Sequence, residues 1–298
     1  MPVAAIPSIL RHSLARGGGA RQAPAGTAVK LAALFAPVAL FAGTTGFAFS
    51  QQKLSPETLA AFDQFIERVE QSMSIRQEDG SVFLWLAEDQ TRLDATEEGD
   101  FVIERLDDDA GLDGAMIHNW IGGMFVRGVA IDDVLTVFLD YDRYPDIYPG
   151  VVESRLLESD GNSNRLYQRL RRDDLVLDTW HEAGYRELDA GRAVTWSRST
   201  EIREVRNAGE SDEEILPDGE GGGYMWRIHV YWRLEQRQDG VFAECHSISM
   251  SRDIPFLLRW IVAPFVRRIP RQGLERSLEA TRVEAQRVSQ GFAAPGVN

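Results

Sequence analysis

Hydrophobic residues follow two different periods along this chain, and the change between them separates helices from strands. Between residues 55 and 77 they recur at steps of three and four, which predicts an amphipathic helix. Ser55 can cap this helix and Pro56 suits its first position. The acidic stretch that follows predicts two short strands, at residues 81–86 and 101–106.

From residue 117 onward, alternating apolar and polar residues predict a series of strands. In the first of them, residues 117–128, Gly122 and Gly123 indicate a bulge or a tight bend. Later strands are separated by turn residues such as Asp239-Gly240, which favour antiparallel hairpins. The predicted strands after the first are residues 151–158, 165–171, 175–185, 193–205, 224–236 and 241–251.

One predicted helix interrupts these strands, starting near Asp133. Val134, Val137 and Phe138 lie at helical spacing and give it an apolar face. The helix cannot continue regularly through Pro145, because proline lacks the backbone N–H that the helix needs. The segment therefore predicts a short amphipathic helix that leads through a turn into the strands.

After the last strand the chain is apolar again. Residues 254–269 are unusually apolar, and Pro270 is typical of a helix start. An acidic, glycine-rich stretch at residues 207–223 has no period and predicts a long loop. The apolar face of the predicted final helix consists of Leu274, Leu278, Thr281, Ala285 and Val288.

The predicted helix that starts near Asp133 is followed by a turn. This segment carries Asp140-Tyr141, Tyr144-Pro145 and Pro149-Gly150-Val151. This segment resembles the opening helix of the helix-grip superfamily, which includes START lipid-transfer domains, polyketide cyclase-like proteins and the birch-pollen allergen type. The resemblance covers residues 117–288. It implies an α+β fold, in which a curved antiparallel sheet wraps around a long C-terminal helix and encloses a cavity. The helix at residues 55–77 is an addition to that fold.

The N-terminal residues of the chain predict export. Residues 1–50 hold four basic residues and no carboxylate, and the apolar run at residues 31–49 is broken by proline and glycine. This pattern predicts a signal peptide and a secreted or periplasmic protein, with a membrane anchor at residues 31–49 as the alternative. The remaining parts are an extension at residues 51–114, the main domain at residues 115–290 and a tail at residues 291–298.

Charge and cysteine content exclude several functions. The chain has a net charge of −14, and without residues 1–50 it keeps 28 basic against 46 acidic residues, a net charge of −18. Nucleic-acid binding is not expected, because it depends on cationic neutralisation of phosphates. Cys245 is the single cysteine, so no disulfide can form within the chain.

Alternation in residues 224–236 assigns the two faces of that strand. Ile228, Val230 and Trp232 belong to the apolar face, which we expect to point inward, and His229 to the outer face. Pairing Gln236 with Val241 across the turn places Trp232 opposite Cys245, Val230 opposite Ser247 and Ile228 opposite Ser249. Trp196 and Val194 of the neighbouring strand are also expected to face inward.

Small residues opposite large ones leave room inside a curved sheet. This room is either a cavity for a hydrophobic small molecule or a core that the tryptophans and the last helix fill. The cavity interpretation is favoured, chiefly by the resemblance. The candidate ligand-binding residues are Trp196, Tyr224, Trp226, Ile228, Val230, Trp232, Cys245, Ser247, Ser249, Trp260, Leu278 and Thr281.

The sequence lacks the common motifs of catalytic and metal-binding sites. It has no GxSxG, HExxH or CxxC pattern, and its histidines show no metal-ligand spacing, so no metal or cofactor is expected. His229 and His246 are expected at the surface. A cyclase-like enzyme is the alternative to a carrier, with His181, Tyr167 and Tyr185 as weak acid–base candidates. A ligand-free interaction module is the third hypothesis.

The apolar segment after the last strand has two interpretations. Residues 254–269 can pack as a lid between the sheet and the final helix, which is the favoured interpretation, with residues 256–265 as the part that bears on the alternative. They can also form an entrance that makes transient contact with a membrane while a ligand enters. The sequence does not predict the oligomeric state.

Overall fold

The computed structural model describes residues 53–78, 82–106, 112–253 and 256–291, with the backbone alone described for residues 256–269. The predicted signal peptide and all but the first residue of the predicted tail lie outside these residues. All of the described residues belong to one unit of the chain, Ser50–Asn298.

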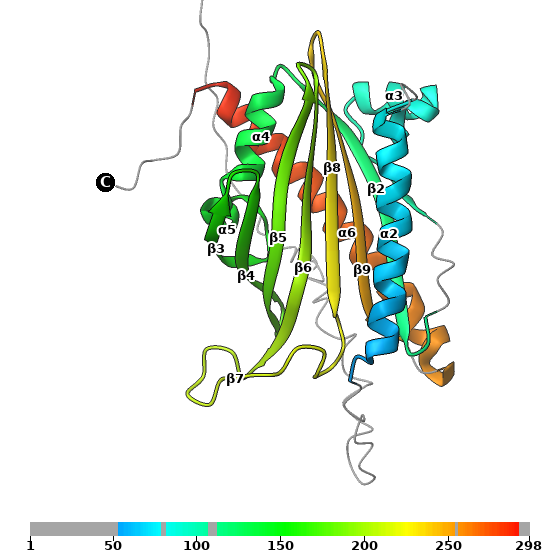
Figure 1. Ribbon diagram of the computed structural model, residues 1–298, viewed down its shortest axis with the longest axis vertical. Coiled ribbons are helices and arrows are strands. Elements are labelled where there is room, and N and C mark those ends of the chain that lie inside the picture. The colour runs from blue at the N-terminus through cyan, green and yellow to red at the C-terminus, as the bar shows by residue number, and fades with distance from the viewer. Residues whose placement is uncertain (1–52, 79–81, 107–111, 254–255, 292–298) are drawn as a thin grey trace, which may run out of the picture. The chain divides into compact units, whose positions relative to one another are not determined.

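Within the described residues, nine antiparallel strands form a single sheet, in the order β1-β2-β9-β8-β6-β5-β4-β3, with β7 added to β6 (Figure 1). The first long strand therefore pairs with the last one, which is the arrangement expected of a helix-grip domain. The predicted strand at 101–106 and those from residue 117 onward are confirmed. The strands are β1 (Val102–Arg105), β2 (Ala115–Arg127), β3 (Val151–Asp160), β4 (Ser163–Arg172), β5 (Leu175–Asp189), β6 (Arg192–Arg206), β7 (Glu214–Ile215), β8 (Arg227–Arg237) and β9 (Gly240–Arg252).

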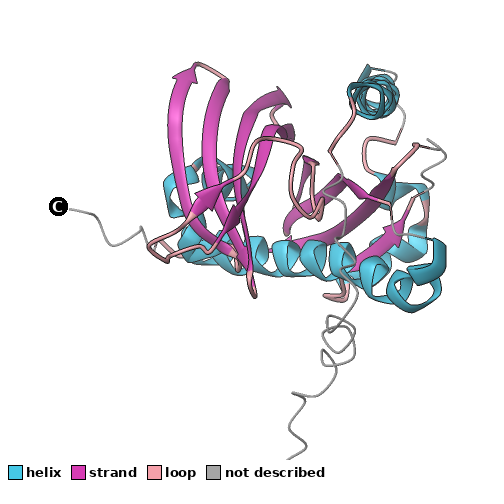
Figure 2. Cartoon of the chain, turned by 90° about the horizontal axis from the view of Figure 1, so that it is seen from below, coloured by secondary structure: helices cyan, strands magenta, loops and turns pink. Residues whose placement is uncertain are grey.

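Helices cover both faces of this sheet. We call the face that contacts α4 and α6 the inner face, and the face that contacts α2 the outer face. Figure 2 shows α6 on one side of the strands and α2, seen end-on, on the other. The helices are α2 (Pro56–Glu78), η1 (Trp85–Glu88), α3 (Gln90–Glu97), α4 (Ile131–Leu139), η2 (Tyr141–Arg143), α5 (Tyr144–Ile147) and α6 (Phe256–Ser289).

The structure differs from the sequence-based expectations in several places. Of the strand predicted at residues 81–86, the described residues 82–86 form none, because Phe83 to Leu86 are all buried instead of alternating, and η1 begins at Trp85. Helix α3 lies in the acidic stretch without having been predicted, and its cap is the Asp89 side chain, which accepts from the Thr91 N–H at 2.9 Å. Helix α6 begins at Phe256 and passes through Pro270, since a proline removes one N–H and can kink a helix without ending it.

Of the bulge or tight bend predicted at the two glycines of β2, the bulge is absent, since the register with β9 is continuous. The glycines serve close packing on both faces. A Cβ at Gly122 would lie 3.1 Å from Leu274 of α6, and a Cβ at Gly123 would lie 2.5 Å from Leu86. Strand β2 is therefore held between two layers that touch its backbone.

Helix α2 packs on the outer face of β2, β8 and β9. Phe62 is fully buried and contacts the His229 ring edge-on, with centroids 5.4 Å apart. Ile66 and Phe65 belong to the same cluster as Ile248 and Met250 of the sheet. The predicted apolar face of this helix thus covers a sheet face that was expected to meet solvent.

The N-terminus of α2 offers a direct test of its contribution to stability. The Ser55 hydroxyl accepts a hydrogen bond from the Thr58 N–H at 3.0 Å, as expected for a helix cap. The variant Ser55→Ala is expected to lower the free energy of unfolding by about 1 kcal/mol. Urea denaturation measures this loss, and Ser55→Asp, which keeps a capping oxygen, should restore most of it.

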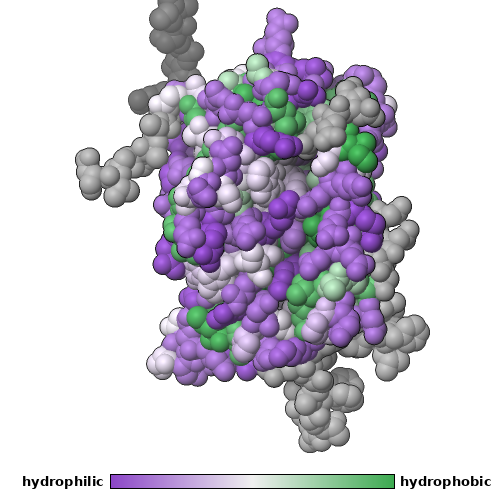
Figure 3. Space-filling view, in the orientation of Figure 1, coloured by the Kyte–Doolittle hydropathy of each residue, from purple (hydrophilic) through white to green (hydrophobic). Residues whose placement is uncertain are grey.

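Among the residues that the structure describes, no helix combines the length and the apolar composition needed to cross a membrane. Figure 3 shows that the face seen in Figure 1 is mainly hydrophilic, with hydrophobic residues in separate small groups.

Candidate ligand site on the inner face

The predicted pairing of β8 with β9 is confirmed. Trp232 lies opposite Cys245, Val230 opposite Ser247 and Ile228 opposite Ser249. This register places the small residues of β9 on the inner face, beside the large residues of β8.

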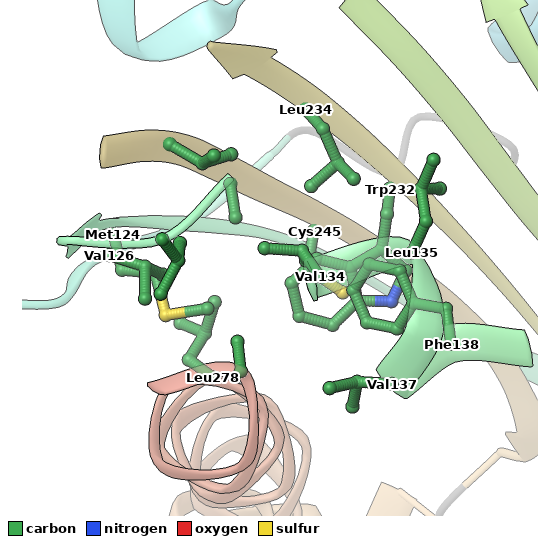
Figure 4. Close-up of a cluster of buried hydrophobic side chains, with 14 of the residues drawn as sticks. Met124, Val126, Val134, Leu135, Val137, Phe138, Trp232, Leu234, Cys245 and Leu278 are labelled. Carbon is green, nitrogen blue, oxygen red and sulfur yellow. The ribbon is translucent and has the colours of Figure 1, made fainter. Parts of the chain in front are cut away.

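One half of the inner face is filled by side chains (Figure 4). Trp232 stacks against Phe138 of α4 at 4.6 Å between ring centroids, and Cys245 beside it is 1% exposed. Leu278 of α6 is fully buried in the same cluster. Burial also raises the pKa of the Cys245 thiol, which disfavours a thiolate nucleophile. These three predicted ligand residues are therefore parts of the core.

Thr281 of α6 is likewise fully buried. Its hydroxyl lies 3.1 Å from the Tyr148 hydroxyl, which joins α6 to the turn before β3. Burial raises the pKa of Tyr148 far above its ordinary value, so the phenol is a neutral hydrogen-bonding group. Thr281 therefore fixes the last helix to the domain.

The other half of the inner face is only partly covered. One row of paired residues crosses four strands from β2 to β6, and each member is half-buried although the strands are central in the sheet. Their outer-face neighbours Tyr231 on β8 and His246 on β9 are 7% and 8% exposed. We call this row the serine row; it consists of Trp120, Ser247, Val230 and Ser197.

Next to the serine row, Ile228 is also half-buried on the inner face. Ser249 opposite it is 9% exposed, and the Ser251 hydroxyl lies 2.9 Å from His118 Nε2. This part of the face therefore combines apolar surface with hydroxyl groups, as small-molecule sites do.

His181 provides the polar end of the row. Its Nδ1 lies 3.1 Å from the Ser197 hydroxyl and its Nε2 lies 3.0 Å from the Thr179 hydroxyl. Burial lowers the pKa of His181 to about 4, so the ring is neutral near pH 7. Because hydroxyl groups engage both nitrogens, the ring holds the Ser197 hydroxyl in position.

The three acid–base candidates do not converge. His181 and Tyr185 face inward, since they pair with Ser199 and Thr195. Tyr167 points to the opposite face, where its hydroxyl donates to Asp178 at 2.8 Å. Burial is the main cause that raises the pKa of Tyr167 to about 12, so this phenol is a structural donor.

Trp196 and Val194 face outward, contrary to the prediction. Trp196 pairs with Tyr231, and Val194 packs with Phe83 under η1. The apolar pattern of this strand was misleading because α2 and η1 make the outer face apolar too. Trp226, just before β8, also packs with Phe62 on the outer side.

Other predicted residues fall elsewhere. Tyr224 is 63% exposed and contributes nothing to an enclosed site. The Trp260 side chain and the predicted membrane entrance at residues 256–265 lie outside the described side chains. In the described part of the chain, no group of three or more His, Cys, Asp or Glu residues could hold a metal ion.

His229 and His246 are buried, not at the surface as predicted. They are 7% and 8% exposed, because α2 covers the strands that carry them. Burial lowers the pKa of each to about 3, with nearby arginines adding to the effect. Both rings are therefore neutral structural groups.

Trp120 and Ser197 were missed in the sequence. Trp120 lies in the predicted strand 117–128, on the same face as His118, and alternation alone could have placed it inward. By alternation, the inward assignment of Val194 and Trp196 leaves Ser197 on the other face, whereas the structure places it inward, opposite Val230. The apolar face of α2 must pack against another apolar surface. The amphipathic pattern of this helix was therefore the signal that the outer face of the sheet also carries apolar residues.

No protein-family model matches the chain, and no curated protein matches it. Among solved structures, the STAR-related lipid transfer protein of Xanthomonas axonopodis (fragment 25-204) is 19% identical with a TM-score of 0.39, over 62% of this chain and 98% of that chain. The Zhui aromatase/cyclase from Streptomyces sp. R1128 is 13% identical with a TM-score of 0.44, over 61% of this chain and 100% of that chain.

A START superfamily protein from Mycobacterium smegmatis is 9% identical with a TM-score of 0.39, over 58% of this chain and 98% of that chain. START proteins and cyclases are thus among the structures to which this chain is similar, as the resemblance implied. At these identities the likeness concerns the backbone arrangement and carries no argument about a ligand or a reaction.

Proposed function

We propose that this chain binds a hydrophobic small molecule with one polar group against the inner face of the sheet, without transforming it. The observation that supports this function is the half-buried serine row on central strands. Its alternation of Trp120, Ser247, Val230 and Ser197 offers apolar surface and hydroxyls in one line.

Apolar and polar contacts contribute to the proposed ligand binding in different ways. Burial of apolar ligand surface contributes about 25 cal/mol per Å², so it supplies most of the affinity. The Ser197 hydroxyl, positioned by neutral His181, gives the polar group a hydrogen-bonding partner. A lipid or an isoprenoid-like molecule has this chemistry. From residues 1–50 we also infer that binding takes place outside the cytoplasm.

Filling the half-buried row tests the proposal. The variant Val230→Trp adds an indole in the middle of the row and is expected to lower the amount of co-purified ligand about tenfold. Native mass spectrometry under mild conditions, followed by organic extraction, measures what each protein retains. The matched control is Val152→Trp, because Val152 is 47% exposed on the edge strand β3.

The proposal requires that the wild type and Val152→Trp retain an apolar small molecule. A clean apo mass for the wild type contradicts it. Equal retention by Val230→Trp also contradicts it, since the ligand must then lie elsewhere.

A further inference from the structure

A hollow lies on the outer face of the sheet, between α2 and strands β2, β8 and β9. Its volume is about 430 Å³, within the range of roughly 300–1,000 Å³ that is usual for small-molecule sites. Because it lies on the opposite side of the sheet from the serine row, it is independent of the function proposed above. Its apolar walls are formed by Phe65, Val69, Met73, Trp85, Leu106 and Ile121.

The charges around this cavity are mainly positive, in a chain whose net charge is −14. Arg68, Arg76 and Arg233 line it, with Glu88 as the only lining carboxylate among the described residues. Arg76 already neutralises Glu88 through an ion pair of 2.9 Å. Arg233 is paired with the buried Glu244, at 3.5 Å between the nearest nitrogen and oxygen. Three arginines against these two carboxylates leave an excess of positive charge, which favours an anionic occupant.

Arg233 lies at the base of the cavity and is 5% exposed. Its guanidinium contacts the Phe83 carbonyl at 3.5 Å, the Met73 carbonyl at 3.4 Å and the Glu244 carboxylate at 3.5 Å. Charge-assisted hydrogen bonds are usually about 2.7–2.9 Å long, so all three contacts are weak. A buried guanidinium with only long contacts can still accept a planar anion in a bidentate arrangement.

The polar neighbours do not compete strongly for this position. Glu244 uses its second oxygen to accept the Leu86 N–H at 3.1 Å. His246 Nε2 and Asn119 Oδ1 are 2.6 Å apart, so these two lining residues already hold each other. The Arg233 guanidinium, which Glu244 contacts only at 3.5 Å, is thus the positively charged group at the base.

We propose that the cavity under α2 binds an amphipathic small molecule that carries one carboxylate. The carboxylate lies on the Arg233 guanidinium, and the apolar body lies between Met73 and Val69 of α2 and Ile121 of the sheet. Arg68, exposed at the rim, attracts the anion on entry.

Isothermal titration calorimetry with decanoate and decanol tests this site, using the Val230→Trp protein so that the serine row is blocked. Decanoate is expected to bind, and decanol to bind at least roughly tenfold more weakly. Met73→Trp, which fills the cavity, is expected to weaken decanoate binding about tenfold. The control Ile75→Trp, at a residue of the same helix that is 55% exposed, should leave binding unchanged.

A further variant isolates the guanidinium. Arg233→Met combined with Glu244→Leu removes it without leaving an unpaired buried carboxylate, and decanoate should then bind no better than decanol. Equal affinities for decanoate and decanol in the Val230→Trp protein overturn the proposal. Absence of decanoate binding there, or undiminished binding in Met73→Trp, overturns it as well. Circular dichroism confirms that each variant is folded.

Discussion

Acidification from pH 7.5 to pH 5 is expected to reduce the stability of this fold steeply. His181, His229 and His246 are buried, and burial lowers their pKa values to about 4, 3 and 3. In the unfolded chain a histidine has a pKa near 6.5, so below that pH the unfolded state binds protons that the folded state does not. Stability therefore falls as pH decreases through 6.5 and continues to fall toward the folded values.

The size of the expected stability loss follows from the difference between the folded and unfolded pKa values of these histidines. Each histidine contributes a loss of about 2 kcal/mol between pH 7.5 and pH 5, so the three together approach the total stability of many domains. Urea denaturation at a series of pH values measures the slope. The slope of the unfolding free energy against pH is proportional to the number of protons taken up on unfolding. Replacing one ring, as in His246→Gln, should therefore reduce this slope by the equivalent of about one proton. Unfolding free energies that stay constant between pH 7.5 and pH 5 would show that the rings are not buried in the neutral form.

Loss of the Glu244 carboxylate is expected to cost about 3–5 kcal/mol, because it leaves the Arg233 charge buried without its partner. The two side chains are 2% and 6% exposed, with 3.5 Å between the nearest oxygen and nitrogen. Burial is the main cause that raises the pKa of Glu244 and lowers that of Arg233. Both shifts favour the neutral forms, so desolvation outweighs the attraction within this pair.

A comparison of single and double variants separates these effects. The combination of Arg233→Met with Glu244→Leu is expected to be less destabilising than Glu244→Ala, since it removes both buried charges at once. The matched control is Glu158→Ala, which breaks an exposed pair with Arg165 and should change stability little. Thermal unfolding of the four proteins gives the comparison. A double variant as unstable as Glu244→Ala would contradict this account.

Local features of the chain were predictable where their cause is local. The Asp239-Gly240 turn determines which residues of β8 and β9 pair. The register from Gln236 to Ile228 therefore follows from the amino-acid sequence. The cap at Ser55 and the apolar face of α2 are local in the same sense. Helix α3 was missed because its composition resembles that of a solvated acidic loop.

The candidate site was harder to predict than the fold. Both faces of the central strands are covered, so hydrophobicity alone could not decide which way Trp196 points. Cys245 and Ser247 lie on the same face of β9, and their similar size gave no reason to separate them. Leu278 fills the space beside Cys245, whereas Ser247 remains half-buried.

By itself the sequence determined the order of the elements, the antiparallel pairing and the inward face of β8, because these depend on turn residues and on alternation between neighbours in the chain. Only the tertiary structure decided which part of the inner face is filled and that α2 covers the outer one. Those outcomes depend on contacts such as Phe62 with His229 and Leu278 with the sheet, between residues far apart in the chain. Such contacts are set by the volume available after all elements have packed, which no local pattern contains.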